Sequence, residues 1–363
     1  GHVDLSSHDT WVAGTPYSTF QRMRDEDPVA WVDEADGSGF WAVTRYNDVV
    51  DLNHRWDDFT SYRGIRLEEM DAEETEARRT LMELDPPDHT RLRRLVNRGF
   101  TRMTVESYEE SIRELTAGIL DEALVHGEFD FVAEVARLLP MRMLGRLLGV
   151  PDDHAEQLVE WGDQLLSNSD PEYTDHVVDQ VDTDEFRLIP FRSPAGLEVF
   201  RYAQEAASER RGCPHDDVIS RLLEPTTDGE PLSDLEFNNF FAVLVAAGND
   251  TTRYSLTEGL RALVDHPDQF RALRNDPSLI DTAVEEILRW TTVTTHFRRT
   301  ATRDQEVGGR SISEGDKVVL WWTAANYDER KFDDPYRFDI RRAPNDHVAF
   351  GRNGPHLCLG AWL

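Results

Sequence analysis

The amino-acid sequence predicts a mainly α-helical fold with small β-sheets at its edge. Apolar residues recur at helical spacing over most of the 363-residue chain, whereas only two short stretches have the composition of strands. Apolar residues make up 39% of the chain, which is enough to bury a substantial core. We find no Gly/Ser-rich or Pro-rich linker and no repeat, so residues 1–363 are predicted to form a single domain.

The helical periodicity gives the order of the predicted elements. Ser233 is suited to a helix N-cap and is followed three residues later by Glu236, which predicts a capping box. Pro267 is typical of the first residue of a new helix. The two predicted strands are Phe40–Thr44 and Lys317–Trp322. The predicted helices are Arg91–Phe100, Ser107–Leu124, Phe131–Leu148, His154–Ser167, Leu197–Arg210, Asp217–Leu223, Ser233–Asp265, Pro267–Asn275 and Ser278–Trp290.

Charge and hydropathy exclude several classes of function. The formal net charge of −31 argues against nucleic acid or an anionic membrane as general partners. No apolar run approaches the roughly 20 residues of a membrane span, and the N-terminal segment is polar. We therefore expect a cytoplasmic protein without a membrane span. The two cysteines, Cys213 and Cys358, do not predict a disulfide framework.

The segment Phe350-Gly-Arg-Asn-Gly-Pro-His-Leu-Cys358-Leu-Gly360 is the most informative part of the chain. Its single cysteine precedes an apolar stretch that we expect to begin a helix at Leu359. The N-terminus of a helix favours the charged thiolate over the thiol. Zinc sites and iron–sulfur clusters need several ligands of this kind, which one cysteine cannot supply. A single thiolate ligand to haem fits the pattern.

This segment resembles the haem-binding signature of the cytochrome P450 family, the haem-thiolate monooxygenases. The residues that match the signature are Gly354, His356, Cys358 and Gly360. Phe350 lies eight residues before Cys358 rather than the more common seven, an insertion found in the bacterial branch that acts on sterols and branched lipids. The resemblance implies a triangular, mainly helical fold around haem (heme b), with Cys358 as the axial ligand and Phe350 and Gly360 beside it. It also implies that the fold continues beyond this sequence, through a helix and a last β-hairpin.

A second motif, Ala246-Ala-Gly-Asn-Asp250-Thr251-Thr, interrupts a run that is apolar on all sides. Gly, Asp and Thr are poor residues for the middle of a buried helix, so the motif indicates a functional site or a widened turn. The alternative is a polar patch where the helix reaches the surface. The motif resembles the family's oxygen-activation kink. That resemblance implies that Thr251 hydrogen-bonds dioxygen or an ordered water, and that Asp250 connects the site to bulk protons.

Glu286 and Arg289 are three residues apart, so they share a helical face and can form an ion pair. The spacing alone has little specificity. Beside the other motifs, it resembles the family's Glu-x-x-Arg pair, which binds a third residue in the loop before the cysteine. Arg342 stands where that partner is expected, and Arg341 is the alternative. The resemblance implies a structural role in haem retention rather than a catalytic one.

Four side chains are candidates for binding the two carboxylates of haem, whose burial requires cations or strong donors. His89 and Arg93 are four residues apart, so they share a helix face, and they resemble the family's propionate-binding pair. Arg299 resembles the arginine that follows the substrate loop, with its neighbour Arg298 as the alternative. His356 is the fourth candidate. For any one of them, the other interpretation is an ordinary surface charge.

The resemblance also implies contacts to substrate from two segments. One segment precedes Asp250 on the same predicted helix, and the other is the loop after the Glu-x-x-Arg helix. His296 occupies that loop as well, and we interpret it as a histidine at the pocket rim rather than a partner of the substrate. Residues 62–82 are rich in charge and predict an exposed lid over the access channel. The predicted substrate contacts are Val243, Ala247, Thr294 and Thr295.

Together these motifs imply a bacterial-type monooxygenase that inserts one oxygen atom from O2 into a C–H bond of an apolar substrate. The stretch 320–329, the Ala-Gly-Asn-Asp-Thr-Thr-Arg motif and the insertion before the cysteine resemble members that act on steroids, terpenoids and branched lipids. Another hydrophobic molecule, such as a polyketide or fatty acid, is the alternative substrate. A peroxide-driven peroxygenase lacks the acid–alcohol pair, and a haem-based sensor or lipid-binding protein does not need it.

The same resemblance implies partners. Electrons are expected from a ferredoxin and a ferredoxin reductase, and the family default is a monomer. Arg91, Arg94 and Arg352 are candidates for a docking surface that an acidic ferredoxin could recognise.

Overall fold

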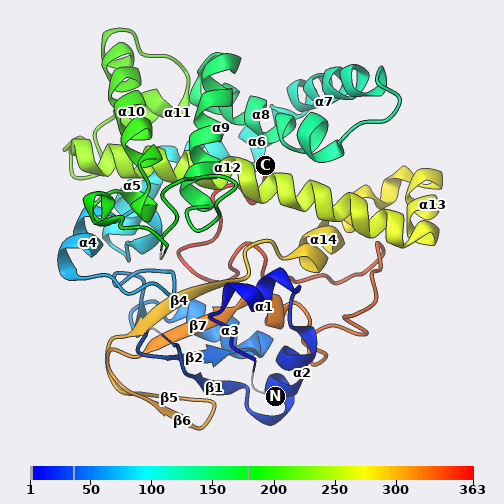
Figure 1. Cartoon of the computed structure of the whole chain (residues 1–363). Helices are drawn as coiled ribbons and strands as arrows, with labels where there is room; N and C mark the ends of the chain where they lie inside the picture. Colours follow the sequence, from blue (N-terminus) through cyan, green and yellow to red (C-terminus); the bar gives the residue numbers. More distant parts are fainter. Residues whose placement is uncertain (1–2, 36, 179) are drawn as a thin grey trace. The chain divides into compact units, whose positions relative to one another are not determined.

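The computed structural model describes residues 3–35, 37–178 and 180–363. The chain forms two compact units (Figure 1). The first unit combines residues 1–70 with 258–358, and the second combines residues 71–257 with 359–363. Every strand of the described chain lies in the first unit, and the second unit consists of helices and loops. The single domain inferred from the sequence stays a prediction.

The first unit is built on a five-stranded sheet with the strand order β1-β2-β7-β4-β3. β2 and β7 run parallel, whereas the other neighbouring strands are antiparallel. A separate hairpin pairs β5 with β6. The strands are β1 (Val29–Val32), β2 (Phe40–Val43), β3 (Phe59–Thr60), β4 (His296–Ala301), β5 (Gln305–Val307), β6 (Arg310–Ile312) and β7 (Lys317–Trp321).

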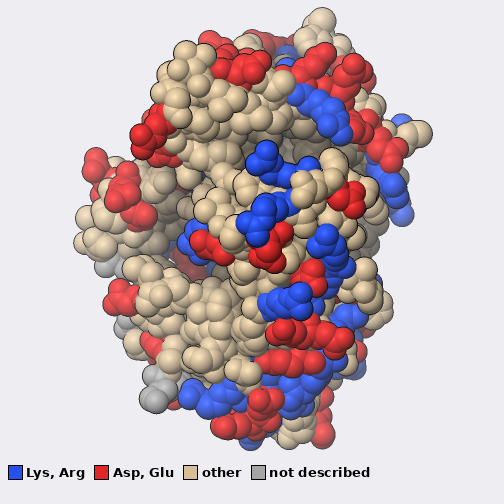
Figure 2. All heavy atoms as spheres, turned by 90° about the vertical axis from the view of Figure 1, so that its right-hand side faces the viewer, with Lys and Arg blue, Asp and Glu red and all other residues tan. Residues whose placement is uncertain are grey.

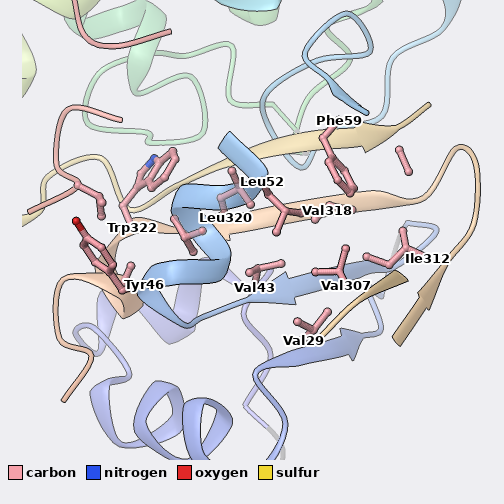
Figure 3. Close-up of a cluster of buried hydrophobic side chains, with 14 of the residues drawn as sticks. Val29, Val43, Tyr46, Leu52, Phe59, Val307, Ile312, Val318, Leu320 and Trp322 are labelled. Carbon is pink, nitrogen blue, oxygen red and sulfur yellow. The ribbon is translucent and has the colours of Figure 1, made fainter. Parts of the chain in front are cut away.

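Alternation along β7 assigns its side chains to two separate cores, because successive strand residues point to opposite faces of a sheet. Val318 and Leu320 lie on one face, where they pack against Leu52 of α3 (Tyr46–His54), as Figure 3 shows. Trp321 lies on the other face, in a cluster with Phe20 of α2 (Tyr17–Glu26). The fully buried β7 therefore has helices on both of its faces.

The remaining helices of the first unit lie in three parts of the chain: one near the N-terminus, three just before β4 and one directly after β7. They include α14, which carries the predicted Glu-x-x-Arg pair. These helices are α1 (His8–Val12), α13 (Pro267–Asn275), the 3₁₀ turn η6 (Pro277–Leu279), α14 (Ile280–Thr291) and α15 (Trp322–Ala325).

The second unit is helical. The α-helices that lie wholly within it are α4 (Ala72–Ala77), α5 (Asp88–Val96), α6 (Arg102–Glu106), α7 (Glu109–Leu124), α8 (Leu138–Leu148), α9 (Asp152–Leu166), α10 (Ala195–Gly212) and α11 (Val218–Leu222). Short 3₁₀ or π segments accompany them at η1 (Leu81–Glu83), η2 (Asn97–Phe100), η3 (Val132–Ala136), η4 (Asp184–Phe186) and η5 (Pro190–Arg192).

The long helix α12 (Asp234–Asp265) begins in the second unit and ends in the first, because the boundary falls between Thr257 and Glu258. Ser233 and Glu236 form the predicted capping contacts at its start, with Glu236 N donating to Ser233 Oγ at 3.2 Å. Polar residues interrupt the centre of α12. None of the described helices is long and apolar enough to cross a membrane.

Every helix predicted from periodicity is confirmed, with ends shifted by a few residues. The helix predicted from Arg91 already begins at Asp88, and its last turn is the 3₁₀ segment η2. Helices α1 to α4, α6 and α15 and five of the strands escaped prediction. β4 shows why, since its sequence His-Phe-Arg-Arg-Thr-Ala buries two arginines where period-two alternation calls for apolar residues.

The prediction of an exposed lid over residues 62–82 is wrong for the part that lies in the first unit. Arg298 Nη1 donates to Glu68 O at 3.0 Å, and Lys317 Nζ donates to Glu69 Oε1 at 2.8 Å. Ile65 is buried. Both cations are themselves buried in the sheet, so they hold this charged segment against it. Sequence alone shows the charges of the segment but not these distant partners.

Charged side chains of both signs lie intermingled over much of the face shown in Figure 2. Elsewhere in the chain, individual cations pair with acids from distant segments, as in Arg310 with Asp27 and Arg330 with Asp25, each at 2.8 Å. Exposed pairs of this kind stabilise the fold little, but they offset the self-repulsion of a chain with a net charge of −31.

Candidate active site

The cysteine loop, residues 346–358, is an irregular segment of the first unit that folds back on itself. Cys358 N donates to Phe350 O at 2.9 Å, which closes the end of the loop. Gly351 has a φ of +72°, a conformation that residues with a side chain rarely adopt. Cys358 is exposed at the closed end. The loop therefore presents a thiol on a conformationally restricted turn.

Residues 359–363 form a turn and not the helix that the sequence predicts after the cysteine. Leu363 N donates to Gly360 O at 2.9 Å, which is the spacing of a turn. The expected helix N-terminus at the thiol therefore has no counterpart in the described chain.

The polar motif of α12 lies in the second unit. Ala247 and Gly248 are exposed there, although the helix residues just before them are largely buried. A Cβ at Gly248 would lie only 3.1 Å from a methyl group of Leu144, so α8 packs closely at this point. The helix continues through the motif without a break, and Thr251 Oγ1 donates to Ala247 O at 3.0 Å. The predicted widened turn is therefore absent from the described helix.

Asp250 forms an ion pair with Arg253, one turn further along α12. The same guanidinium donates to both carboxylate oxygens of Asp163, on α9, at 3.1 Å each. Burial raises the pKa of Asp250 more than Arg253 lowers it, and the charge of Asp163 adds to the rise. A carboxyl group with a raised pKa is more readily protonated near neutral pH, which is what proton delivery requires.

Arg299 and His356 are the two candidate carboxylate-binding residues of the first unit. Arg299, on β4, is buried, and its guanidinium donates to Asn53 Oδ1 at 3.1 Å and to Arg298 O at 2.9 Å. His356 Nε2 lies 3.4 Å from Ser61 Oγ. Arg298, the alternative to Arg299, instead bonds to the segment around Glu68, and burial lowers its pKa. The two neighbouring arginines therefore serve different parts of the unit.

His89 and Arg93 are the candidates of the second unit, where they lie one turn apart on α5. His89 is buried, and Arg93 Nε donates to Asn97 Oδ1 at 3.2 Å. Arg91 and Arg94, on the same helix, are two of the arginines predicted to form a docking surface for a ferredoxin. Arg94 is exposed, but Arg91 forms an ion pair with Glu236 of α12.

The predicted substrate contacts divide between the units. Val243 is buried on α12 of the second unit, whereas Thr294 and Thr295 are partly buried just before β4 of the first. Thr295 Oγ1 lies 2.9 Å from His296 Nδ1, and the His296 ring packs on Trp321 with centroids 4.4 Å apart. Burial lowers the pKa of His296 to about 4, so the ring is neutral at pH 7. His296 thus packs against the sheet while staying partly exposed, and its interpretation as a rim histidine stays a prediction.

Glu286 and Arg289 form a completely buried ion pair on α14. Arg289 donates to the two oxygens of Glu286 at 2.8 and 2.9 Å, and Arg342 Nε donates to Glu286 Oε2 at 3.0 Å. Arg341, the alternative partner, is exposed. Arg342 Nη1 and Nη2 also donate to backbone carbonyls between residues 333 and 337. The network ties α14 to the segment that leads into the cysteine loop.

Sequence reasoning missed several residues that support these side chains. Asn326 is buried, accepts a bond from Val348 N at 2.8 Å through Oδ1, and receives Arg289 Nη1 on its carbonyl at 2.8 Å. Arg253, with its partner on α9, had been noted only as part of the motif. Asn249 is 2% exposed, and neither of its amide atoms has a hydrogen-bond partner among the described residues. Of these residues, only Arg253 could have been found from the sequence, because it stands three residues after Asp250, a spacing that allows an ion pair on one helix face.

Each unit has features that fit a bound haem. The first offers an exposed thiol at Cys358, together with the cationic or hydrogen-bonding side chains of Arg299 and His356. The second offers the exposed small residues Ala247 and Gly248 in an otherwise buried stretch of α12. A thiolate ligand, donors for two carboxylates and exposed small side chains are elements that such a cofactor needs.

Comparisons with known proteins give the same picture. The family model for cytochrome P450 matches residues 37–363. The steroid C26-monooxygenase of Mycobacterium tuberculosis is 38% identical over 360 residues, which cover 96% of this chain and 79% of that protein. The methyl-branched lipid omega-hydroxylase of the same species is 35% identical over 373 residues, which cover 99% of this chain and 84% of that protein.

A similar solved structure is that of Mycobacterium marinum cytochrome P450 CYP268A2 in complex with pseudoionone. It matches with a TM-score of 0.89 and 38% sequence identity, covering 100% of this chain and 88% of that one. This similarity confirms the predicted mainly helical fold class with small sheets.

The Glu286 network predicts a large effect on stability. We expect Glu286→Gln to lower the free energy of unfolding by about 3–5 kcal/mol, because the buried Arg289 and the partly buried Arg342 lose the charge that compensates them. Urea unfolding followed by circular dichroism measures the change. Arg341→Ala, at the exposed neighbour of Arg342, is the control and should change stability little. A loss in Glu286→Gln no larger than that of the control contradicts the assignment.

Proposed function

The chain belongs to the cytochrome P450 family and is a haem-dependent monooxygenase of apolar substrates, and on this premise we propose that it hydroxylates a steroid, a terpenoid or a methyl-branched lipid. The observation that carries the proposal is the 38% identity to a steroid C26-monooxygenase over 96% of the chain. The methyl-branched lipid omega-hydroxylase extends the proposed class to branched lipids. The neighbour in complex with pseudoionone supports a hydrophobic ligand of similar kind.

We assign Cys358 as the thiolate ligand of haem. The bond from Cys358 N to Phe350 O fixes the turn that carries the sulfur. When bound, the haem–thiolate group supplies the electron-rich iron that activates dioxygen. The part of this chain is to hold the sulfur in one place and to bind the cofactor's carboxylates.

The proposed binders of those carboxylates are His89, Arg93, Arg299 and His356. Arg299 is positioned for this role by its contacts with Asn53 and the Arg298 carbonyl, which leave the direction of its guanidinium fixed. A fixed cation matches a buried carboxylate better than a mobile one, since less side-chain entropy is lost on binding. Phe350 and Gly360 flank Cys358 and complete the proposed cofactor-binding set.

Thr251 and Asp250 are the proposed catalytic residues. Thr251 Oγ1 donates its hydrogen to Ala247 O, so its oxygen is oriented to accept a bond from water or to donate after rotation. Asp250 has a raised pKa and is held by Arg253. Together they can pass protons from solvent to dioxygen, which must take up two protons when one of its atoms leaves as water.

Ala247 is exposed one turn before Thr251, and Val243 lies one turn before Ala247. Their small, apolar side chains suit a substrate that offers only hydrocarbon surface. We also propose Thr294 and Thr295 as contacts with substrate.

A ferredoxin with its reductase is the proposed electron source, and a cytoplasmic monomer is the proposed state of the protein. Arg94 is exposed and can take part in ferredoxin docking. Arg352 is 43% exposed, but its Nη1 lies 3.1 Å from Asp346 Oδ1. Arg91 is paired with Glu236, so it contributes less charge to a partner than the sequence predicted.

The substrate class can be tested by optical titration of the ferric protein. The panel consists of a sterol, a steroid ketone, a methyl-branched fatty acid and a monoterpenoid. We expect a saturable low-spin to high-spin change with at least one of them, because an apolar ligand that fills the site would exclude water from the bound cofactor. Saturable binding of a polar polyketide or an amino acid, with no response to the panel, contradicts the lipid assignment.

The catalytic assignment predicts an uncoupled enzyme when the hydroxyl is removed. Thr251→Ala should lower the rate of product formation by on the order of 100-fold while reductant is still consumed, because protons no longer reach dioxygen correctly. The consumed reducing equivalents should appear as hydrogen peroxide. Thr252→Ala changes the adjacent exposed threonine and is the matched control. If Thr251→Ala couples reductant consumption to product formation as well as the control does, the proposed role of Thr251 is excluded. If the wild type binds the ligand but forms no product, a sensor is favoured instead.

A further inference from the structure

Asn53 joins two parts of the first unit that are far apart in the sequence. It is the penultimate residue of α3 and is 2% exposed. Its Oδ1 accepts a bond from Arg299 Nη2 at 3.1 Å. Its Nδ2 donates to Arg352 O at 2.9 Å and to Gly351 O at 3.4 Å. One side chain therefore contacts both a proposed carboxylate-binding arginine and the backbone of the cysteine loop.

The chemistry of these partners fixes the orientation of the Asn53 amide. A guanidinium can only donate hydrogen bonds, so the amide oxygen must face Arg299. Backbone carbonyls can only accept, so the amide nitrogen must face the loop. An aspartate could satisfy the arginine but would place negative charge against two carbonyl oxygens. A leucine of similar size could satisfy neither side.

The cysteine loop is shaped around the end of α3 that carries Asn53. A Cβ at Gly354 would lie 2.6 Å from both Nδ2 and the carbonyl oxygen of Asn53, so the loop backbone approaches as closely as glycine permits. His54 Nδ1 also lies 3.1 Å from Asn353 O, and Asn353 itself has a φ of +60°. The end of the helix therefore contacts the loop at several consecutive residues.

A neighbouring contact extends this arrangement to the second candidate of the unit. Ser61 is completely buried, and its Oγ lies 3.4 Å from His356 Nε2. The stretch from Asn53 to Ser61 thus contacts both Arg299 and His356, as well as the loop that ends in Cys358.

We propose that Asn53 is a positioning residue of the cofactor site, which sets the Arg299 guanidinium and the cysteine loop in fixed register. The proposal rests on the proposed roles of Arg299 and Cys358. Asn53 contacts neither the thiol nor the substrate in this account. It acts because one amide fixes the direction of the cation and restrains the loop backbone six and seven residues before the sulfur. Residues that orient ligands in this way commonly change cofactor affinity by about 10- to 100-fold when they are replaced.

The test measures the rate at which the holoenzyme transfers haem to excess apomyoglobin. We expect Asn53→Leu and Asn53→Ser to lose haem about 10- to 100-fold faster than the wild type. Asn47→Leu makes the same chemical change on the exposed side of α3 and should retain haem normally. Asn53→Ser introduces no bulk, so it decides the question if Asn53→Leu does not fold.

A double-mutant cycle separates positioning from general stability. If Asn53 acts through Arg299, replacing Asn53 in an Arg299→Ala protein should accelerate haem loss far less than it does in the wild type. A purely structural residue should instead give the same factor in both backgrounds, and that result overturns the proposal. Wild-type rates in both Asn53 variants overturn it as well. If the wild type itself lacks thiolate-ligated haem, the proposed function fails, and that result is distinguishable from failure of this inference.

Discussion

The buried carboxylate of Glu286 is the interaction on which the rest of the first unit depends. It lies out of contact with solvent and receives two bonds from Arg289 and one each from Arg342 Nε, Asp339 N and Asn345 Nδ2. A charge in such a place is tolerated only when its partners are fixed, because an unpaired buried charge costs several kcal/mol. The three partners of Glu286 outside α14 all belong to residues 339–345. Helix α14 therefore determines where the chain enters the cysteine loop.

From that point the loop is held at three successive places. Asn326 accepts from Val348 N, Asn53 donates to the carbonyls of residues 351 and 352, and Phe350 O accepts from Cys358 N. Two of these contacts use the buried amide side chains of Asn326 and Asn53, and the third is a backbone bond. The loop lacks regular secondary structure, yet these bonds restrain its backbone at several points. Such restraint suits a ligand whose position relative to the bound cofactor must not vary.

The longer helices from α5 onward and the Glu286–Arg289 pair could be predicted from the sequence because their signals are local, and the candidate residues of the cysteine segment were recognised for the same reason. Glu286 and Arg289 are three residues apart, and the cysteine segment is contiguous. Asn53 could not be found in this way, since its partners lie 246 and 298 or more residues away and an asparagine before a histidine carries no pattern. The widened turn expected near Thr251 failed for the opposite reason. Its local residues disfavour a helix, but packing against α8 and the bond to Ala247 keep α12 continuous.

The most direct test of the account is the absorption spectrum of the ferrous carbonyl complex in the wild type and in Cys358→Ser. Cys213→Ser, at the other exposed cysteine, is the matched control. The account predicts the red-shifted band of thiolate-ligated haem in the wild type and in Cys213→Ser, and its loss in Cys358→Ser with circular dichroism unchanged. The same thiolate band in Cys358→Ser would contradict the assignment of Cys358 as the ligand.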